Sequence, residues 1–375
     1  MPTVIAPEAI FLVGELGLPE EKVAVLAALS SHATAQYSSD AVAGSPLVEA
    51  VVEHAKKHVG EAAEALPAGS VLLSPAQSRN REGLALDTTP AIAVAAAAAV
   101  FETAGQSISQ RKPEILQVAE TAHRAIHAGI SAEGELAAAL HGGLVKVTSQ
   151  RDADPRIETL EPPEGLHLVV FQTGQALFPA DWLACVCQFA ERYPPAYAQI
   201  IRNLLDRTAR FVDQLSEGNV TAAIASAGRY GHCITQLAAA VSTPSQAAPL
   251  RQAMELAKEI GGIAKTASAV HSDLGIAMFA TPEAAGLFER ACRPPLVPLP
   301  LDLDLSGARR VSNQARQSAE IRTPMPEIGP SSISSQAIVR GFLEDDSTDR
   351  TLSESDELSL STPEHPSPTF LPRWR

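Results

Sequence analysis

The stretch ALDTTPAIAVAAAAAVF, residues 85–101, decides how this chain folds. Asp87, Thr88 and Thr89 are residue types that cap helix N-termini, and Pro90 suits a first helical turn because its missing N–H costs nothing there. The alanine-rich run that follows can pack closely on every side, so it predicts a buried helix. The first N–H groups of a helix bind either an anion or a cap, and here the sequence supplies its own carboxylate and hydroxyl groups.

The composition sets the class of protein. The chain has 375 residues, 45% of them hydrophobic, and a formal net charge of −14, which allows a large core and favours two domains. The acidic balance argues against nucleic acid or an anionic membrane as the main partner. We expect a cytoplasmic protein, because no apolar run is long enough to span a bilayer and the first residues lack the pattern of a secretory signal.

The pattern of apolar residues predicts alternating strands and helices up to a connector. Strands are expected at 3–15, 71–73 and 144–147, helices at 46–65, 85–101, 114–128 and 132–140, and either a strand or a short helix at 22–30. The polar, proline-containing stretch 149–164 predicts a domain boundary near residue 160. Beyond it we expect strands at 166–171, 275–279 and 296–305, the last as an edge strand, and helices at 181–192, 195–217, 220–239, 250–260 and 281–290.

The composition changes after Gly307. The remainder is rich in Ser, Thr, Pro, Asp and Glu and lacks a sustained apolar period, which predicts a disordered acidic tail over residues 308–375. Two apolar groups interrupt it, and each is either plain tail or a short docking peptide. The first group has the spacing of a helix that binds in a groove and consists of Ile338, Val339, Phe342 and Leu343. The second group lies between arginines and consists of Phe370, Leu371 and Trp374. We expect the tail to dock a protein partner.

Four stretches, taken together, are more specific than these patterns. They are APEAIFLVGE at residues 6–15, ALDTTPAIAV at 85–94, SAEGELAAALHGG at 131–143 and GGIAKTASAVHSDLGIAMF at 261–279. In order and spacing they resemble four motifs of the GHMP kinases, nearest the mevalonate and phosphomevalonate kinase branch. The resemblance covers residues 6–310. It implies an α+β fold of two domains, residues 1–160 and 161–307, with a small-molecule site in the cleft between them.

The resemblance also implies roles for particular residues. Thr88 and Thr89 replace two serines of the phosphate loop, one of which commonly contacts magnesium. Lys265 and Asp273 match charged positions of the last motif, and Glu135 takes the place of the aspartate that acts as base. If the protein is an active kinase, these five residues form its nucleotide and catalytic site, with ATP and Mg²⁺ as cofactors.

Departures from the motifs argue against that activity. Ala85 and Asp87 replace two glycines of the phosphate loop, and Asp87 puts a negative charge where phosphate oxygens would sit. Ala9 replaces the lysine of the first motif, and Glu135 is one methylene longer than aspartate, which can misplace a base by about an ångström. Residues 270–272, Val-His-Ser, replace a run of three glycines. We therefore expect a catalytically degenerate protein that acts by binding and needs no cofactor, with an active mevalonate- or phosphomevalonate-type kinase as the alternative.

Other candidate chemistry is weaker. Glu120, His123 and His127 have the spacing of metal ligands on one helix, but a solvated or cleft-facing helix side is the ordinary outcome, and no metal site is expected. Asp302 and Asp304 alternate on the predicted edge strand and are expected to face solvent. The four cysteines lack the spacing of a zinc site and are expected to be core thiols: Cys185, Cys187, Cys233 and Cys292.

Overall fold

The computed structural model describes residues 1–16, 22–39, 45–66, 69–74, 88–127, 132–150, 155–174, 182–241, 248–267 and 273–311. These residues belong to one compact unit, Met1–Asn313. Ala85, Asp87, residues 270–272 and the two apolar groups of the tail lie outside the described residues. The expected division into domains at residue 160 stays a prediction.

The first sheet has six strands, and all of its pairings are antiparallel. Its order is β10-β1-β2-β4-β5, and β3 pairs with the later half of β2, beyond the part that pairs with β4. The strands are β1 (Thr3–Val13), β2 (Val23–Ser38), β3 (Ser70–Ser74), β4 (Leu144–Thr148), β5 (Arg156–Leu160) and β10 (Arg309–Val311). Strand β1 thus lies inside the sheet, between β2 and the short strand β10.

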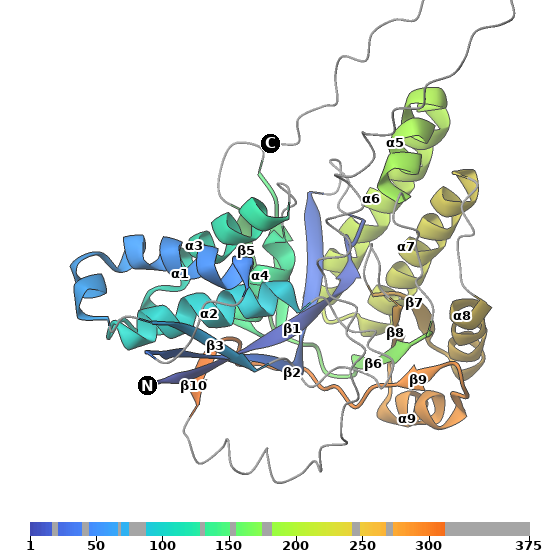
Figure 1. The fold of residues 1–375 in the computed structure, drawn as a ribbon. Coiled ribbons are helices and arrows are strands. Elements are labelled where there is room, and N and C mark those ends of the chain that lie inside the picture. The colour runs from blue at the N-terminus through green and yellow to red at the C-terminus, as the bar shows by residue number, and fades with distance from the viewer. Residues whose placement is uncertain are drawn as a thin grey trace, which may run out of the picture. The chain divides into compact units, whose positions relative to one another are not determined.

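Helices from the first half of the chain pack against this sheet (Figure 1). They are α1 (Pro46–Val59), α2 (Thr89–Thr103), α3 (Lys112–Ile126) and α4 (Glu133–His141), with 3-10 turns at Gly60–Ala65 and Ile108–Gln110. The predicted buried helix is α2, which contacts the other three helices and strands β1 and β2. Its alanines make this possible, because small side chains let neighbouring elements approach on every side. The N-cap is Thr88, but its side chain forms no capping hydrogen bond, contrary to the expectation for this hydroxyl.

The second sheet has the order β7-β8-β6-β9, again antiparallel. Its strands are β6 (His167–Gln172), β7 (Ile263–Thr266), β8 (Leu274–Phe279) and β9 (Val297–Pro298), and the helices of this half are α5 (Trp182–Arg192), α6 (Pro194–Ser216), α7 (Val220–Ala240), α8 (Ala248–Ile260) and α9 (Pro282–Ala291). Among the described helices, none is long and apolar enough to cross a membrane.

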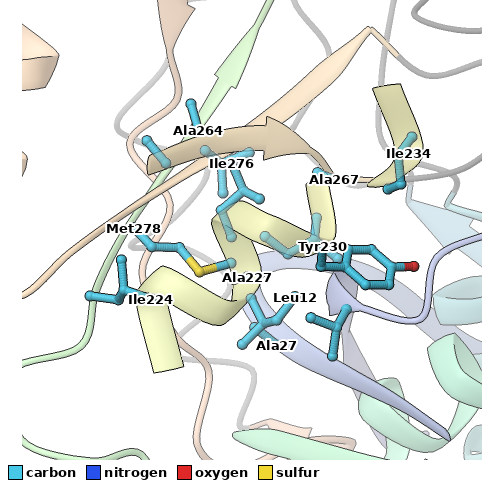
Figure 2. Packing of buried hydrophobic residues seen from close by; sticks show 14 of the residues in the cluster. Leu12, Ala27, Ile224, Ala227, Tyr230, Ile234, Ala264, Ala267, Ile276 and Met278 are labelled. Carbon is cyan, nitrogen blue, oxygen red and sulfur yellow. The ribbon is translucent and has the colours of Figure 1, made fainter. Parts of the chain in front are cut away.

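Helix α7 joins the two sheets into one core. Figure 2 shows its side chains between Leu12 and Ala27 of the first sheet and Ala264 and Ile276 of the second. All of these residues belong to a single cluster of buried apolar side chains. The relative position of β1 and β7 is therefore set by packing on α7, and both strands carry residues of the candidate site.

Several expectations need correction. The connector 149–164 contains strand β5, whereas the stretch 22–30 is the beginning of strand β2, which is one of its two expected alternatives. The expected edge strand 296–305 is a strand only at Val297–Pro298, and Leu303 adds an isolated bridge to Leu29. The predicted tail begins too early, because Arg309–Val311 pairs with Thr3–Ile5 of β1. The cysteine prediction is wrong for Cys187, which is exposed, whereas Cys233 and Cys292 are buried.

Candidate functional site

A buried ion pair connects the first and fourth motifs. Lys265 Nζ on β7 lies 2.8 Å from Glu15 Oε1, just after β1, and both side chains are almost wholly excluded from solvent. The ammonium also donates to the carbonyl oxygen of Thr266, at 2.6 Å, and the Thr266 hydroxyl donates to Glu15 Oε1, at 2.9 Å. A buried charge needs such partners, because removing an unpaired ion from water costs roughly several kcal/mol of folding free energy. The charge of Lys265 is therefore committed to a structural contact.

Helix α7 completes this buried network. The Glu15 backbone N–H donates to the Tyr230 hydroxyl oxygen at 3.2 Å, and Lys265 Nζ lies 5.7 Å from the centre of the Tyr230 ring. Burial raises the pKa of Glu15 above its ordinary value, although Lys265 and Thr266 act in the opposite direction. Lys265 and Thr266 thus stabilise the charged form of the Glu15 carboxylate, whereas burial opposes it.

Main-chain hydrogen bonds bring the same two motifs side by side. The Phe11 N–H donates to the Ala267 carbonyl at 3.0 Å, and the Ala267 N–H donates to the Leu274 carbonyl at 3.0 Å. Asp273, one residue before β8, is buried, and its carbonyl accepts from both the N–H and the hydroxyl of Thr173, at 2.8 and 2.9 Å. The carboxylate of the predicted site residue Asp273 is thus carried on a backbone segment that Thr173 fixes in place.

The position of the expected lysine is occupied by an apolar cluster. Ala9 and Phe11 project from the same face of β1 and pack with side chains of β2, β4, β5 and α4. A Cβ at Gly134, in the first turn of α4, would lie 2.8 Å from Leu26 Cδ1 and 3.6 Å from Phe11 Cε1, so α4 approaches the sheet closely here. Glu135, the candidate base, follows directly and is half-buried. The side chains that pack around Ala9 are thus apolar, where the resemblance implies an ammonium group.

The remaining predicted residues lie at the start of α2. Thr89 Oγ1 is 3.4 Å from His123 Nε2 of α3, and the His123 ring stacks on His127 at 4.2 Å between ring centres. Glu120 forms an ion pair with Arg124. Among the described residues, no group of three or more His, Cys, Asp or Glu side chains could hold a metal ion. The five predicted site residues are therefore distributed over three places: the start of α2, the first turn of α4, and the strands β7 and β8.

A second charged network surrounds Asp304. Its carboxylate accepts from His32 Nε2 at 2.5 Å and from Arg309 Nη1 at 2.8 and 3.0 Å, and also from the N–H groups of Ser306 and Gly307. Burial by itself raises the pKa of Asp304, but these donors outweigh it and hold the pKa far below its usual range. The expectation that Asp304 faces solvent is wrong, whereas Asp302 is exposed.

The His-Gly-Gly turn of the third motif packs against this network. The Gly143 N–H donates to the Asp304 carbonyl at 2.6 Å, and a Cβ at Gly142 would lie 2.2 Å from the Gly307 nitrogen. Burial, together with the nearby Lys112, lowers the pKa of His141 to about 4, so this imidazole is neutral at physiological pH. The turn therefore permits a close crossing of two chain segments.

Comparison with solved structures identifies the fold of the chain. A Lin0012 protein from Listeria innocua superposes with a TM-score of 0.65 at 14% identity, covering 83% of this chain and 99% of that one. Streptococcus pneumoniae phosphomevalonate kinase in complex with phosphomevalonate and AMPPNP gives 0.64 at 15%, covering 81% and 100%. L. major mevalonate kinase in complex with R-mevalonate gives 0.61 at 13%, covering 82% and 96%. The chain has a GHMP-kinase-like fold.

This fold confirms the predicted fold class and leaves the activity open, because one GHMP-kinase-like fold can carry more than one function. No protein-family model matches the sequence, and no curated protein matches it. Sequence reasoning missed three features of these networks: the pairing of Glu15 with Lys265, the contacts of Tyr230, and the burial of Asp304. A signal existed for the first, since Glu15 ends one motif and Lys265 belongs to another.

Proposed function

We propose that this chain is a GHMP-kinase-like protein that no longer transfers phosphate and that acts by binding a protein partner. The observation that carries the proposal is the apolar cluster around Ala9, next to Glu135. Catalysis of phosphoryl transfer consists almost entirely of positioning and of stabilising developing negative charge with cations. Ala9 offers no cation at this position, and Lys265 is held by Glu15. Neither of the two motif positions therefore supplies a free ammonium group.

The replacements outside the described residues support the same conclusion. Asp87 adds a negative charge directly before the helix whose N-terminus would receive phosphate, and like charges repel strongly in a partly buried site. Val270 in place of glycine resists positive φ, so the loop before Asp273 cannot easily follow the backbone path that a glycine run permits. Three separated motifs have thus lost groups that serve phosphate binding.

Phosphotransfer is the first test. Mevalonate and phosphomevalonate are the substrates to try, because solved structures of similar fold contain R-mevalonate or phosphomevalonate. With millimolar Mg-ATP and either substrate, we expect no ADP formation above the protein-free blank. The finding that would overturn the proposal is turnover that Glu135→Gln abolishes and Glu133→Gln preserves. Glu133 is the matched control, since it lies in the same helical turn but pairs with Arg124 and Ser149.

Nucleotide binding is a separate question. A ligand present at about one hundred times its dissociation constant raises the free energy of unfolding by about 2.7 kcal/mol, which a melting experiment detects. We expect no shift with Mg-ATP. A shift without turnover makes the nucleotide a ligand of a non-catalytic protein and is compatible with the proposal.

An active kinase is the second candidate, and the start of α2 favours it. The Thr88 hydroxyl forms no capping hydrogen bond, so it is not consumed by its own helix. In this candidate Thr88, Thr89, Lys265, Asp273 and Glu135 form a rebuilt ATP and Mg²⁺ site. Thr88→Val would then reduce a Mg-ATP-dependent melting shift, whereas our first proposal predicts no shift to reduce.

The partner-binding half of the proposal concerns the acidic segment 314–375. We expect the full chain to capture a protein partner that the chain 1–313 does not capture, while both have the same melting temperature. Replacing Phe342 and Leu343 with serine should abolish capture if the first apolar group is the docking peptide. The same change at Phe370 and Trp374 is the matched control. Capture that persists in chain 1–313 would contradict this half of the proposal.

A further inference from the structure

A cavity of about 360 Å³ lies between the second sheet and the returning chain. Its walls come from the beginning of β6, one side of α9, residues 301–303 and Leu29 of β2. Helix α9 contacts β6, and β9 pairs with β6, so these elements lie side by side (Figure 1). The described lining includes none of the five predicted nucleotide and catalytic residues. Pockets that bind small molecules begin at roughly this size, about 300 Å³.

The lining is of mixed character, and the larger part of its exposed surface is polar. Most lining residues are aliphatic, among them Leu29, Leu168, Val169, Ala285, Leu301 and Leu303. The ionisable residues described in the lining are His167, Glu289 and Asp302. Two carboxylates and an imidazole, with no lysine or arginine among the described lining residues, favour a positively charged ligand over an anion.

The two carboxylates remain available to such a ligand. The structure describes no ion pair of Glu289 or Asp302 with any residue in its described ranges. Asp302 is held in place by its backbone, since its N–H donates to Ser30 Oγ at 3.0 Å and its carbonyl accepts from the Ser30 N–H at 2.8 Å. Arg293, close in sequence to Glu289, instead donates to the carbonyls of Arg290 and Cys292, both at 2.7 Å.

We propose that this cavity binds a small primary amine with an apolar body. The ammonium group pairs with Glu289 and Asp302, and the aliphatic wall takes the hydrocarbon part. The size of the ligand follows from the volume of the cavity. Because a dry cavity of about 150 Å³ accommodates benzene, a cavity of about 360 Å³ accommodates roughly a dozen non-hydrogen atoms. The carboxylates select the charge of the ligand, and the aliphatic side chains contact its hydrocarbon part.

The test compares, on the full chain, three six-carbon probes that differ in charge: hexylamine, 1-hexanol and hexanoate. Binding is measured by isothermal titration at low ionic strength, where exposed charges are screened least. We expect hexylamine to bind most tightly and hexanoate least. Glu289→Gln and Asp302→Asn should each weaken hexylamine about two- to fivefold, the range of an exposed ion pair, and leave 1-hexanol unchanged. Glu283→Gln is the control, an exposed carboxylate on α9 outside the lining.

A cavity-filling variant locates the site independently of charge. Gly286 lines the cavity within α9, and a Cβ there meets only the end of the flexible Arg290 side chain, at 3.1 Å from Nη1. Gly286→Leu should abolish binding of both hexylamine and 1-hexanol, and an unchanged far-ultraviolet spectrum and melting transition show that it folds. Equal affinity for the three probes, or hexylamine binding that persists in Gly286→Leu, would overturn the proposal.

Discussion

Removing Lys265 should destabilise the folded unit severely, because it leaves the buried Glu15 without its ammonium partner. Breaking a buried pair by deleting one member typically costs about 3–5 kcal/mol. Lys265→Met keeps the length and apolar stem of the side chain, so packing against Tyr230 is largely preserved. For a folded unit of about 310 residues, unfolding entropy of about 2.1 cal/mol/K per residue converts this loss into a melting temperature lower by about 5–8 °C.

The pH dependence of this loss separates the charge effect from packing. Burial already raises the pKa of Glu15, and removing Lys265 removes the largest influence that lowers it, so the pKa rises further. A carboxyl whose pKa is raised in the folded state stabilises that state below the unfolded pKa, near 4.5, and this contribution is lost as pH rises through the folded pKa. We therefore expect Lys265→Met to be less destabilised at about pH 5 than at about pH 8.

Two further variants make the experiment decisive, with stability measured by urea unfolding and by thermal melting. Lys265→Met combined with Glu15→Gln should regain part of the loss, because no uncompensated charge remains. Lys146→Met breaks the half-exposed pair with Glu158 and should cost at most about 1 kcal/mol. A loss in Lys265→Met as small as that in Lys146→Met, or one that is equal at both pH values, would refute the reasoning.

Three other predictions follow from the second network and the chain end. Asp304→Asn should cost about 1–3 kcal/mol of unfolding free energy at neutral pH and flatten the acid side of the stability profile. The reason is that the depressed pKa of Asp304 stabilises the fold above about pH 4, and this contribution is lost as pH falls. Urea unfolding at about pH 7 and pH 3 measures both effects, and an unchanged acid side of the profile would contradict the prediction. Gly142→Ala should cost about 3 kcal/mol or more, because its Cβ meets the Gly307 backbone at 2.2 Å. Gly60→Ala, also at positive φ but with no atom within 4 Å of the added Cβ, should cost about 1 kcal/mol. Similar losses of the two variants in thermal melts would show that positive φ, and not the close contact, sets the loss of stability. Truncation to residues 1–307 should lower the melting temperature because it removes β10 and Arg309, while truncation to 1–313 should not.

The order of elements was predictable because local signals and motif order agreed. Helix α2 follows from a proline in its first turn and the alanine run. The start of α9 follows from Thr281, whose hydroxyl accepts from the Ala284 N–H at 3.2 Å. Strands β5 and β10 were not predictable from local pattern, since each is short and mostly polar and is defined by its pairing with a neighbour.

The charged networks were harder to predict because they depend on contacts between distant residues. Glu15 and Lys265 are each a single charge within its own motif. Packing on α7 and the main-chain hydrogen bond from Phe11 to Ala267 bring them together. For Asp302 and Asp304 the alternation rule failed for a physical reason. The segment forms only an isolated bridge, Leu29 with Leu303, so the two carboxylates are not held on one face of a regular strand.

The pairing of β10 with β1 has a consequence for biosynthesis. Strand β1 leaves the ribosome long before its outer neighbour β10, which contains Val311, at the far end of the folded unit. At about 5–20 residues per second, that edge stays open for roughly 15–60 s during translation. Open strand edges recruit other chains, so nascent copies on one polysome are exposed to mispairing throughout this interval. Placing β10 ahead of β1 by circular permutation would shorten the delay to the time needed to make a hairpin.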